Sequence, residues 1–293
     1  MQALGYYLVV PLLYLVSILP DFLLYFFSDA LYFLVYHVVG YRKKVVTENL
    51  KKSFPEKSEK EINAIRKKFY RYFCGLVFEI FRMLTISKEK MREVCTLDPS
   101  TIKLFESYAN KKQSIITVMG HWGNWEWAQN AFSATINQQL YIIYHPLHNK
   151  KFDGLMDKMR TRFGTKTIPM KDTLREMLSH RNEVCVTAFA SDQTPPPQGA
   201  YWTTFLNQDT PVFFGTEKIS KKLNLPIVYI SIKLVSRGRY RIFAETLVED
   251  PSTTSEGEIS ELHTRRLEKD IREIPEIWLW SHRRWKHKRP QQN

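Results

Sequence analysis

The first 40 residues constrain the fold of this chain most strongly, because they are almost free of charge. They contain 30 apolar residues and two charged ones, Asp21 and Asp29. Residues 3–20 form an uncharged stretch of 18 residues, which is at the short end of what crosses a bilayer core. The chain lacks the positively charged start of a secretory signal. The apolar side chains of such a segment must be shielded from water, either by the rest of the protein or by lipid.

The aromatic and basic residues in and after this segment indicate that lipid shields it. Residues 22–40 contain seven Phe and Tyr residues, and Arg42, Lys43 and Lys44 follow directly. Aromatic rings are typical of the lipid–water interface, and the basic residues would contact phosphate headgroups. We therefore predict a helical membrane anchor at 1–40, spanning or interfacial, with a pair of buried core helices as the alternative. The positive-inside bias then places the second domain, residues 41–293, on the cytoplasmic side.

The net charge of +13 is concentrated in two segments. Residues 41–72 carry eleven Lys and Arg against four Asp and Glu, and residues 278–289 carry five basic residues and no acid. Clusters of this kind favour a polyanionic partner, namely anionic lipid, an acidic protein or nucleic acid. Nucleic acid is disfavoured because no recognition helix, RNA-binding motif or zinc-finger spacing accompanies the clusters. A basic, membrane-bound adaptor without enzymatic activity remains a second class of function.

The rest of the chain has the composition and pattern of an α/β protein. With 44% apolar and 25% charged residues it can bury a large core, and its three widely spaced cysteines exclude a disulfide scaffold. Apolar residues three and four apart predict helix over 45–84, and short apolar runs then alternate with helical patterns. This alternation predicts a mixed central sheet sandwiched by helices, with ligands at the carboxyl ends of the strands. The predicted strands are 114–119, 140–144, 166–169, 184–190, 226–234 and 239–247, and the later helices 125–136, 151–163, 172–181, 215–223 and 256–273.

The segment Gly-His-Trp-Gly-Asn-Trp-Glu, residues 120–126, directly follows the first of these strands. His121 therefore lies at a strand end, where an α/β fold places its chemistry. Gly123 and the good N-cap residue Asn124 predict a turn, with Glu126 in the first turn of the next helix. We expect the Glu126 carboxylate to fold back onto the His121 imidazole, which would leave the other ring nitrogen as a general base.

An enzyme nucleophile is missing from this neighbourhood. Neither Ser nor Cys occurs between Ile115 and Phe132, and the chain has no Gly-x-Ser-x-Gly motif. The reacting hydroxyl would then belong to a substrate that His121 deprotonates. A metal site built from His121, His145 and His148 is a weaker reading, because the sequence does not specify its arrangement. We predict no metal.

The segment around His121 resembles the His-x-x-x-x-Asp/Glu motif of glycerolipid acyltransferases, and most closely that of the late acyltransferases of lipid A assembly, the lauroyl and myristoyl transferases. Further blocks similar to that family follow in order over nearly the whole chain. They are residues 41–44, 48–50 and 53–55, then 144–146 and 159–164, then 190–193 and 211–215, and finally 275–285. Two positions depart from the family pattern, since His145 replaces an Arg and residues 216–218 replace small residues. These departures bear on which lipid accepts the acyl group more than on the type of reaction.

The resemblance implies transfer of an acyl group from an acyl-carrier-protein or CoA thioester to a hydroxyl of a membrane lipid, in the bacterial inner membrane and without a cofactor. A lipid A precursor is the acceptor it favours, with a lysophospholipid or an aminolipid as alternatives. His121 would be the general base and Glu126 its orienting partner. Arg160, or backbone N–H groups near Asn124, would stabilise the oxyanion.

Three further groups are predicted from their positions. Arg160 and Arg162 are two apart, so only one of them should face the site from a helix. Asp192 and Gln193 end a strand at the edge that carries His121, and Asp192 could position Arg160 or accept a hydrogen bond from a sugar hydroxyl. The basic clusters could hold an acidic acyl carrier protein or lipid phosphates. The tryptophans of the last block could be core residues or an interfacial anchor.

Overall fold

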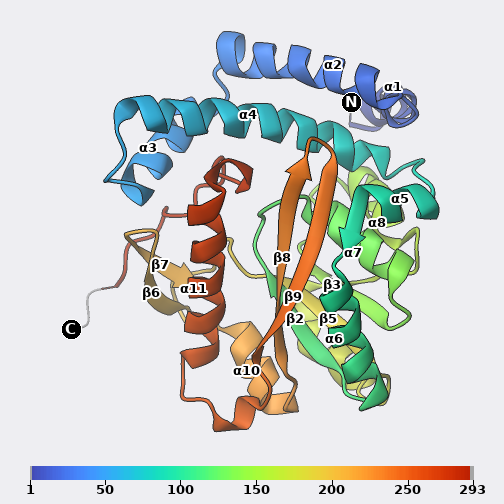
Figure 1. Ribbon diagram of the computed structural model, residues 1–293, viewed down its shortest axis with the longest axis vertical. Helices are drawn as coiled ribbons and strands as arrows, with labels where there is room; N and C mark the ends of the chain where they lie inside the picture. The colour runs from blue at the N-terminus through green and yellow to red at the C-terminus, as the bar shows by residue number, and fades with distance from the viewer. Residues whose placement is uncertain (1, 291–293) are drawn as a thin grey trace.

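The computed structural model describes residues 2–290 and centres on a seven-stranded mixed sheet (Figure 1). The strand order is β1-β9-β8-β2-β5-β3-β4, in which β8 and β9 are antiparallel and the other neighbours are parallel. Helices cover both faces, so the predicted α/β fold is confirmed. The strands are β1 (Cys95–Leu97), β2 (Ile115–Met119), β3 (Gln139–Tyr144), β4 (Lys166–Pro169), β5 (Cys185–Ala190), β8 (Ile227–Ser236) and β9 (Arg239–Val248).

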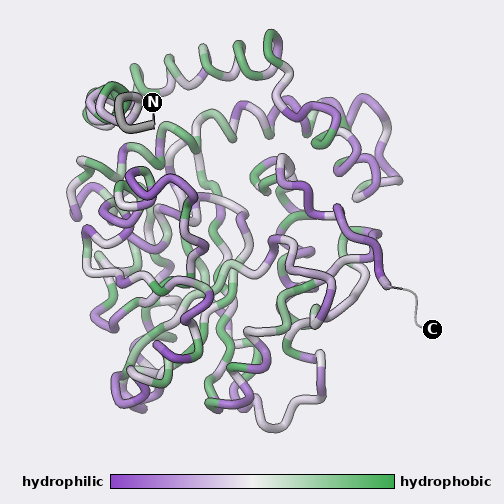
Figure 2. The backbone as a smooth tube through the Cα atoms, turned by 180° about the vertical axis from the view of Figure 1, so that it is seen from behind, coloured by the Kyte–Doolittle hydropathy of each residue, from purple (hydrophilic) through white to green (hydrophobic). Residues whose placement is uncertain are grey.

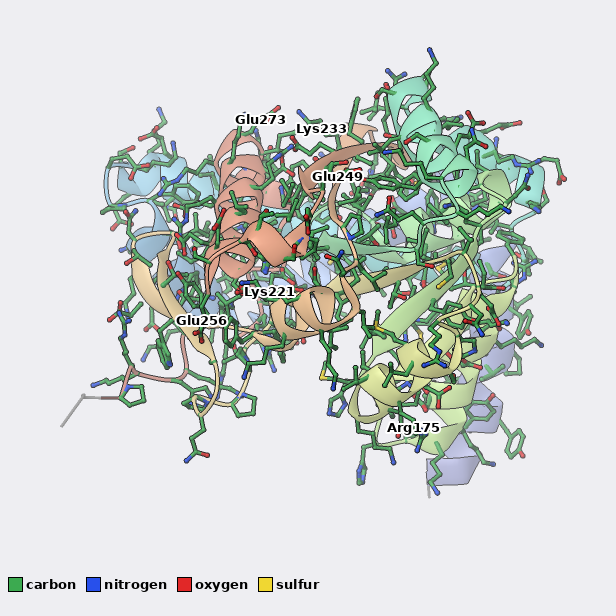
Figure 3. All side chains as sticks on the ribbon, turned by 90° about the horizontal axis from the view of Figure 1, so that it is seen from below. Arg175, Lys221, Lys233, Glu249, Glu256 and Glu273 are labelled. Carbon is green, nitrogen blue, oxygen red and sulfur yellow. The ribbon has the colours of Figure 1, made fainter. Side chains whose placement is uncertain are left out.

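Each face of the sheet has its own hydrophobic core, because successive side chains of a strand point to opposite faces. Ile115 and Ile230 belong to the core under α5–α8, whereas Ile116 and Tyr229 belong to the core under α11. The outer side of α11 is polar, and its Glu273 pairs with Lys233 of β8 at 2.8 Å (Figure 3). The helices are α5 (Lys88–Val94), α6 (Pro99–Asn110), α7 (Trp125–Thr135), α8 (Lys150–Thr161), α9 (Thr173–Ser179), α10 (Gly215–Leu223) and α11 (Glu258–Glu273), with short 3-10 turns at Met170–Asp172, Pro251–Thr253 and Pro275–Ile277.

The region predicted as helix over 45–84 consists of two helices, α3 (Lys43–Ser53) and α4 (Glu59–Arg82). Pro55 interrupts the pattern, because proline cannot continue a helix from the preceding turn. Ser58 then caps α4 in a capping box with Glu61, whose carboxylate accepts the Ser58 backbone N–H at 2.9 Å.

Some elements of the fold were not predicted. Strands β6 (Tyr201–Phe205) and β7 (Gln208–Val212) form a separate antiparallel pair. Two residues, Leu206 and Asn207, connect them with φ angles of 49° and 62°, as a type I′ hairpin turn requires. Strand β1, with three residues, and helices α5 and α6 were also absent from the prediction. Strand β1 carries too few periods of hydrophobicity to be recognised. Helix α6 is as long as the predicted helix α8, and its start signal, Asp98 as N-cap before Pro99, was overlooked.

The N-terminal segment forms helix α1 (Gln2–Ser17) and helix α2 (Asp21–Tyr32), which continues as a π-helix over Phe33–Val39. Both helices contact α4 and form the largely apolar end of the molecule seen in Figures 1 and 2. Within residues 2–290, Asp21–Val39 is the one helix long and apolar enough to cross a membrane, with a mean hydropathy of 1.6. The uncharged stretch 3–20, considered above as a possible span, does not form one helix, because α1 ends at Ser17 and Pro20 is the N-cap of α2.

One side of this N-terminal segment is attached to the protein and the other is exposed. Asp29 pairs with Arg71 of α4 at 3.1 Å and with Arg237 of the β8–β9 turn at 2.7 Å. Only 17% of the Asp21–Val39 window is buried, so the alternative of buried core helices is wrong. The exposed apolar side chains include Phe22, Phe26, Phe33, Leu34, Val38 and Val39.

Candidate active site

His121 lies at the carboxyl end of β2, as predicted, but its carboxylate partner is Asp192. The His121 Nδ1 atom is 2.5 Å from Asp192 Oδ1, and the His121 backbone N–H donates to Asp192 Oδ2 at 2.8 Å. Strands β2 and β5 are parallel neighbours with Met119 opposite Ala190. The residues that follow the two strands therefore meet at one edge of the sheet.

Glu126 has a different partner from the one predicted. Its buried carboxylate accepts from Arg160 Nε at 3.0 Å and Nη2 at 2.5 Å, and from Gln129 Nε2 at 2.6 Å. The first turn of α7 directs Glu126 toward α8, which carries Arg160, and the imidazole is already held by Asp192. The prediction that Glu126 folds onto the His121 ring is therefore wrong, and so is the prediction that Asp192 positions Arg160.

The charges around His121 favour its protonated form. Burial alone would lower the pKa of His121, but the Asp192 carboxylate outweighs it and raises this pKa above the ordinary value. Burial likewise opposes ionisation of Asp192, yet the His121 ring and the Trp278 indole lower its pKa to about 2. Asp192 is thus a carboxylate at neutral pH, and it stabilises an imidazolium that forms beside it.

The second ring nitrogen of His121 faces the open side of the site. With Nδ1 held by Asp192, Nε2 is the nitrogen left for a substrate proton. The Gln193 amide nitrogen lies 3.2 Å from Nε2, and the Trp125 ring packs edge-on against the imidazole at 4.8 Å between centroids. The predicted site residue Gln193 is therefore part of the same cluster.

Arg160 and Arg162 diverge, as their spacing predicted. Arg160 lines the cavity described below, and its pKa lies above the ordinary value because Glu126 outweighs the effect of burial. Arg162 instead donates to the backbone carbonyl of Met83, outside that cavity. Its predicted role in substrate binding finds no geometric support, because the alternation that brings Arg160 inward turns Arg162 away.

Asn124 is the N-cap of α7, as predicted, since its Oδ1 accepts the Trp127 N–H at 2.9 Å. Its Nδ2 donates to Glu79 of α4 at 2.9 Å. This buried carboxylate also accepts from Tyr25 of α2 at 3.0 Å and from Tyr240 of β9 at 2.7 Å. Burial raises the pKa of Glu79. The Glu79 cluster, which was not predicted, connects the N-terminal segment to the helix that carries Glu126.

The C-terminal block closes over the His121 loop. Trp278 forms an isolated bridge with Trp122 and donates to Asp192 Oδ2 at 2.7 Å. Trp278 and Trp280 are buried in the core under α11, so the core alternative for these tryptophans is confirmed. Gly123, with φ of 74°, is required in this loop, because a Cβ there would overlap the carbonyl oxygen of Ile232.

A cavity of about 330 Å³ opens beside His121, on the face covered by α7 and α8. The polar side chains that line it include His121, Gln193, Glu126, Arg160 and Tyr144, together with His145, one of the positions that depart from the family pattern. The remaining wall is mostly apolar and includes Phe105, Phe132, Leu140, Val186, Ile230 and Ile242. It extends along β5 from Ala190 to Val186, a length of about 13 Å at the rise of a strand. Such a space fits a long apolar chain whose polar end lies at His121.

The part of the chain that the structure describes contains no set of side chains arranged as metal ligands. No group of three or more His, Cys, Asp or Glu side chains there is arranged to hold a metal ion. His121, His145 and His148 therefore do not form the metal site considered from the sequence. The base, carboxylate and guanidinium at the cavity instead suit proton transfer and stabilisation of a developing negative charge.

Comparison with known protein families gives one match over nearly the whole chain. A family model described as bacterial lipid A biosynthesis acyltransferase matches residues 1–287. A search of curated proteins finds none that matches. The matched range contains the N-terminal helices, the His121 loop and the C-terminal block that contacts it.

Proposed function

The chain belongs to the family of bacterial lipid A biosynthesis acyltransferases and is an acyltransferase, and we propose that it moves a fatty acyl group from an acyl-carrier-protein thioester to a hydroxyl of a lipid A precursor. The observation that carries this proposal is the position of His121 Nε2 at the polar end of an apolar cavity, with Nδ1 held by Asp192. An acyl chain in the cavity would bring its thioester carbon to the base.

In the proposed reaction His121 is the general base. Its Nε2 takes the proton of the acceptor hydroxyl as the oxygen attacks the thioester carbon, and a C–O bond forms. The tetrahedral intermediate then collapses, the C–S bond breaks, and the imidazolium returns its proton to the leaving thiolate. Asp192 stabilises the imidazolium between these two steps. No cofactor is needed, because the thioester already supplies the activated acyl group.

Arg160 is the proposed donor to the oxyanion of that intermediate. Arg160 lines the cavity beside His121. The Glu126 carboxylate accepts hydrogen bonds from two of its nitrogens, and the centroid of the Tyr144 ring lies 5.8 Å from its guanidinium carbon. A cation that is already oriented costs little reorganisation when negative charge develops. Glu126 thus acts through Arg160 in this proposal and not through His121.

The proposed location is the cytoplasmic face of the bacterial inner membrane, with the N-terminal segment in the interface. Helix α2 packs along α4, and Asp29, near the middle of the Asp21–Val39 helix, pairs with two arginines outside the segment. Crossing the bilayer would carry these charges into hydrocarbon, which is costly. The exposed aromatic residues and the basic residues 42–44 suit an interfacial position.

Sedimentation with membranes tests this location. Replacing both Phe22 and Phe26 by Ser should leave a protein that 1 M salt extracts, because the remaining attraction is electrostatic and the Debye length falls to about 3 Å. A matched pair, Leu178→Ser with Leu262→Ser, removes two exposed apolar residues elsewhere and should stay bound in salt. Equal retention of the two variants would rule out the interfacial face.

The proposed partners are an acidic acyl carrier protein and an anionic lipid acceptor, with no nucleic acid. The basic residues of 41–72 and 278–289 supply the complementary charge. Acylation of a lysophospholipid or an aminolipid would use the same chemistry, so the acceptor must be identified directly. A basic adaptor without activity is disfavoured by the family match.

Mass spectrometry of lipids tests the function. The membrane-bound protein is incubated with acyl-carrier-protein or CoA thioesters and with lipid A precursors, lysophospholipids or aminolipids. We expect a lipid A precursor to gain the mass of one acyl group from the carrier-protein donor, and His121→Ala to give none. Product on another acceptor, or from CoA alone, would overturn that part of the proposal.

A further inference from the structure

A second cavity lies on the other side of Asp192, under α11. Its volume is about 10 Å³, close to the space one water molecule occupies. Its polar wall comes from Ser191 and Asp192 after β5, Tyr229 of β8, His263 and Thr264 of α11, and Arg284 of the C-terminal block. The polar residues of this small cavity are not used by the reaction proposed above, apart from Asp192.

Arg284 is the unusual member of this wall, because it is a guanidinium that is 2% exposed. Its Nη2 donates to the carbonyl of Pro211 at 2.7 Å. Among residues 2–290, its Nε and Nη1 have no hydrogen-bond partner, and no carboxylate pairs with it. Burial lowers the pKa of Arg284 to about 10, so the group is still a cation at neutral pH. A buried cation with two nitrogens that lack a hydrogen-bond partner needs an acceptor.

The cavity also offers acceptors. Asp192 receives three hydrogen bonds, two from His121 and one from Trp278, and a carboxylate has about four acceptor sites. Nε2 of His263 and Oγ of Ser191 are likewise buried without a partner in the described chain. Burial lowers the pKa of His263 to about 4, so its ring is neutral at pH 7 and can accept. Free donors and free acceptors around one water-sized space are what a bridging water requires.

We propose that this cavity binds one water molecule, which accepts an N–H from Arg284 and donates to Asp192, and that Arg284 is thereby a positioning residue for the His121–Asp192 pair. The Arg284 guanidinium and a protonated His121 ring would both interact with the Asp192 carboxylate. The positive charge of Arg284 therefore makes protonation of His121 less favourable. It therefore lets His121 lose its proton at a lower pH than Asp192 alone would allow. The catalytic consequence rests on the proposed function, whereas the water and the titration of His121 do not.

Other charged or titratable groups face this pair, and all of them stay in place in the test below. They are Glu126 of α7, Arg160 of α8, Tyr229 of β8, His263 of α11 and His282 of the C-terminal block. Arg284 is thus one of two arginine cations among the groups that face the pair, and the other, Arg160, is neutralised by Glu126.

The first test titrates His121 by NMR with 13C-labelled histidine, its signal assigned by its loss in His121→Asn. In Arg284→Met the midpoint should move to higher pH, because a neutral side chain of similar length no longer opposes the imidazolium. Arg284→Lys keeps the charge and should titrate close to the unmodified protein. Arg283→Met removes one exposed charge from the adjacent position and should leave the midpoint unmoved. An unmoved midpoint in folded Arg284→Met overturns the electrostatic role.

The second test needs no variant and no substrate. A crystal structure of the full chain at a resolution that shows ordered water should contain one water within hydrogen-bond distance of both Arg284 and Asp192. Arg284 bound directly to Asp192, or a cavity without density, would overturn the bridging water. Failure of lipid acylation with this water present would count against the proposed function and not against the site.

Discussion

The two cavities that meet at the His121–Asp192 pair differ in size and in the charged groups that line them. The one under α7 and α8 has about 330 Å³ and a mostly apolar wall, while the one under α11 has about 10 Å³ and a wall in which the buried Arg284 lies among both polar and apolar side chains. They lie on opposite faces of the sheet because alternate residues of each strand face opposite sides. Beside the His121–Asp192 pair, the face under α7 and α8 therefore has room for a substrate chain, whereas the cavity under α11 has room for about one water molecule next to Asp192.

The largest effect is expected where the two cavities meet. His121→Ala should reduce acyl transfer by at least about 10²–10⁴-fold, the usual contribution of a general base. The rate is measured by mass spectrometry of the acylated lipid, and circular dichroism checks that the variant is folded. A folded His121→Ala protein with nearly normal turnover would show that neither cavity serves chemistry at His121.

Asp192→Asn should lower kcat/KM by about 10²–10³-fold, because the base remains but the imidazolium loses its counter-charge. Asp192 raises the pKa of His121, so its loss lowers that pKa. The neutral imidazole is the active form, and the acidic limb of the pH profile should therefore move to lower pH. This direction is opposite to the one expected for Arg284→Met. If the acidic limb of the pH profile does not move in Asp192→Asn, Asp192 does not set the pKa of His121. The cavity under α11 could then not act on His121 through Asp192.

Glu126→Gln should reduce the rate by about 10–10²-fold, since Arg160 stays in the cavity but loses the carboxylate that orients it. If Glu126 acts only through Arg160, then adding Glu126→Gln to Arg160→Gln should cost little more than Arg160→Gln alone. Steady-state rates of the two single variants and the double variant measure this coupling. Fully additive losses would mean that Glu126 acts on another group, such as His121.

The smallest effect concerns the depth of the apolar cavity. Phe132→Leu shortens a side chain of its wall that packs on Phe105 at 4.8 Å between centroids. The ratio of rates with longer and shorter acyl donors should rise by about 2–10-fold, since one buried methylene is worth roughly 0.8 kcal/mol, or about fourfold. Val212→Ala, in the wall of the small cavity under α11, is the control and should leave the ratio unchanged. A change of equal size in both variants would point to general loosening.

The sequence predicted most elements between β2 and α11, and it missed β1, β6, β7, α5 and α6. Strands β2, β3, β4, β5, β8 and β9 and helices α7 to α11 lie within a few residues of their predicted bounds. Each of them repeats a hydrophobic period or has a clear cap. Strand β7 was missed because it contains Pro211 and the hairpin turn lacks glycine. For the N-terminal segment, composition predicted an apolar surface correctly, but Pro20 and the contacts with α4 decided which residues form the long helix.

For the site, the sequence by itself determined the place of the chemistry: His121 after the first strand of the parallel core, Asn124 as a cap, only one arginine of the pair Arg160 and Arg162 facing inward, and no nearby nucleophile. Those are local properties, set by spacing along one segment. Only the tertiary structure decided which carboxylate holds His121 and which holds Arg160. Asp192 is 71 residues from His121 in the chain, and the parallel register of β2 and β5 brings them together. A contact made by pairing distant strands depends on the register of the sheet, which local spacing does not encode.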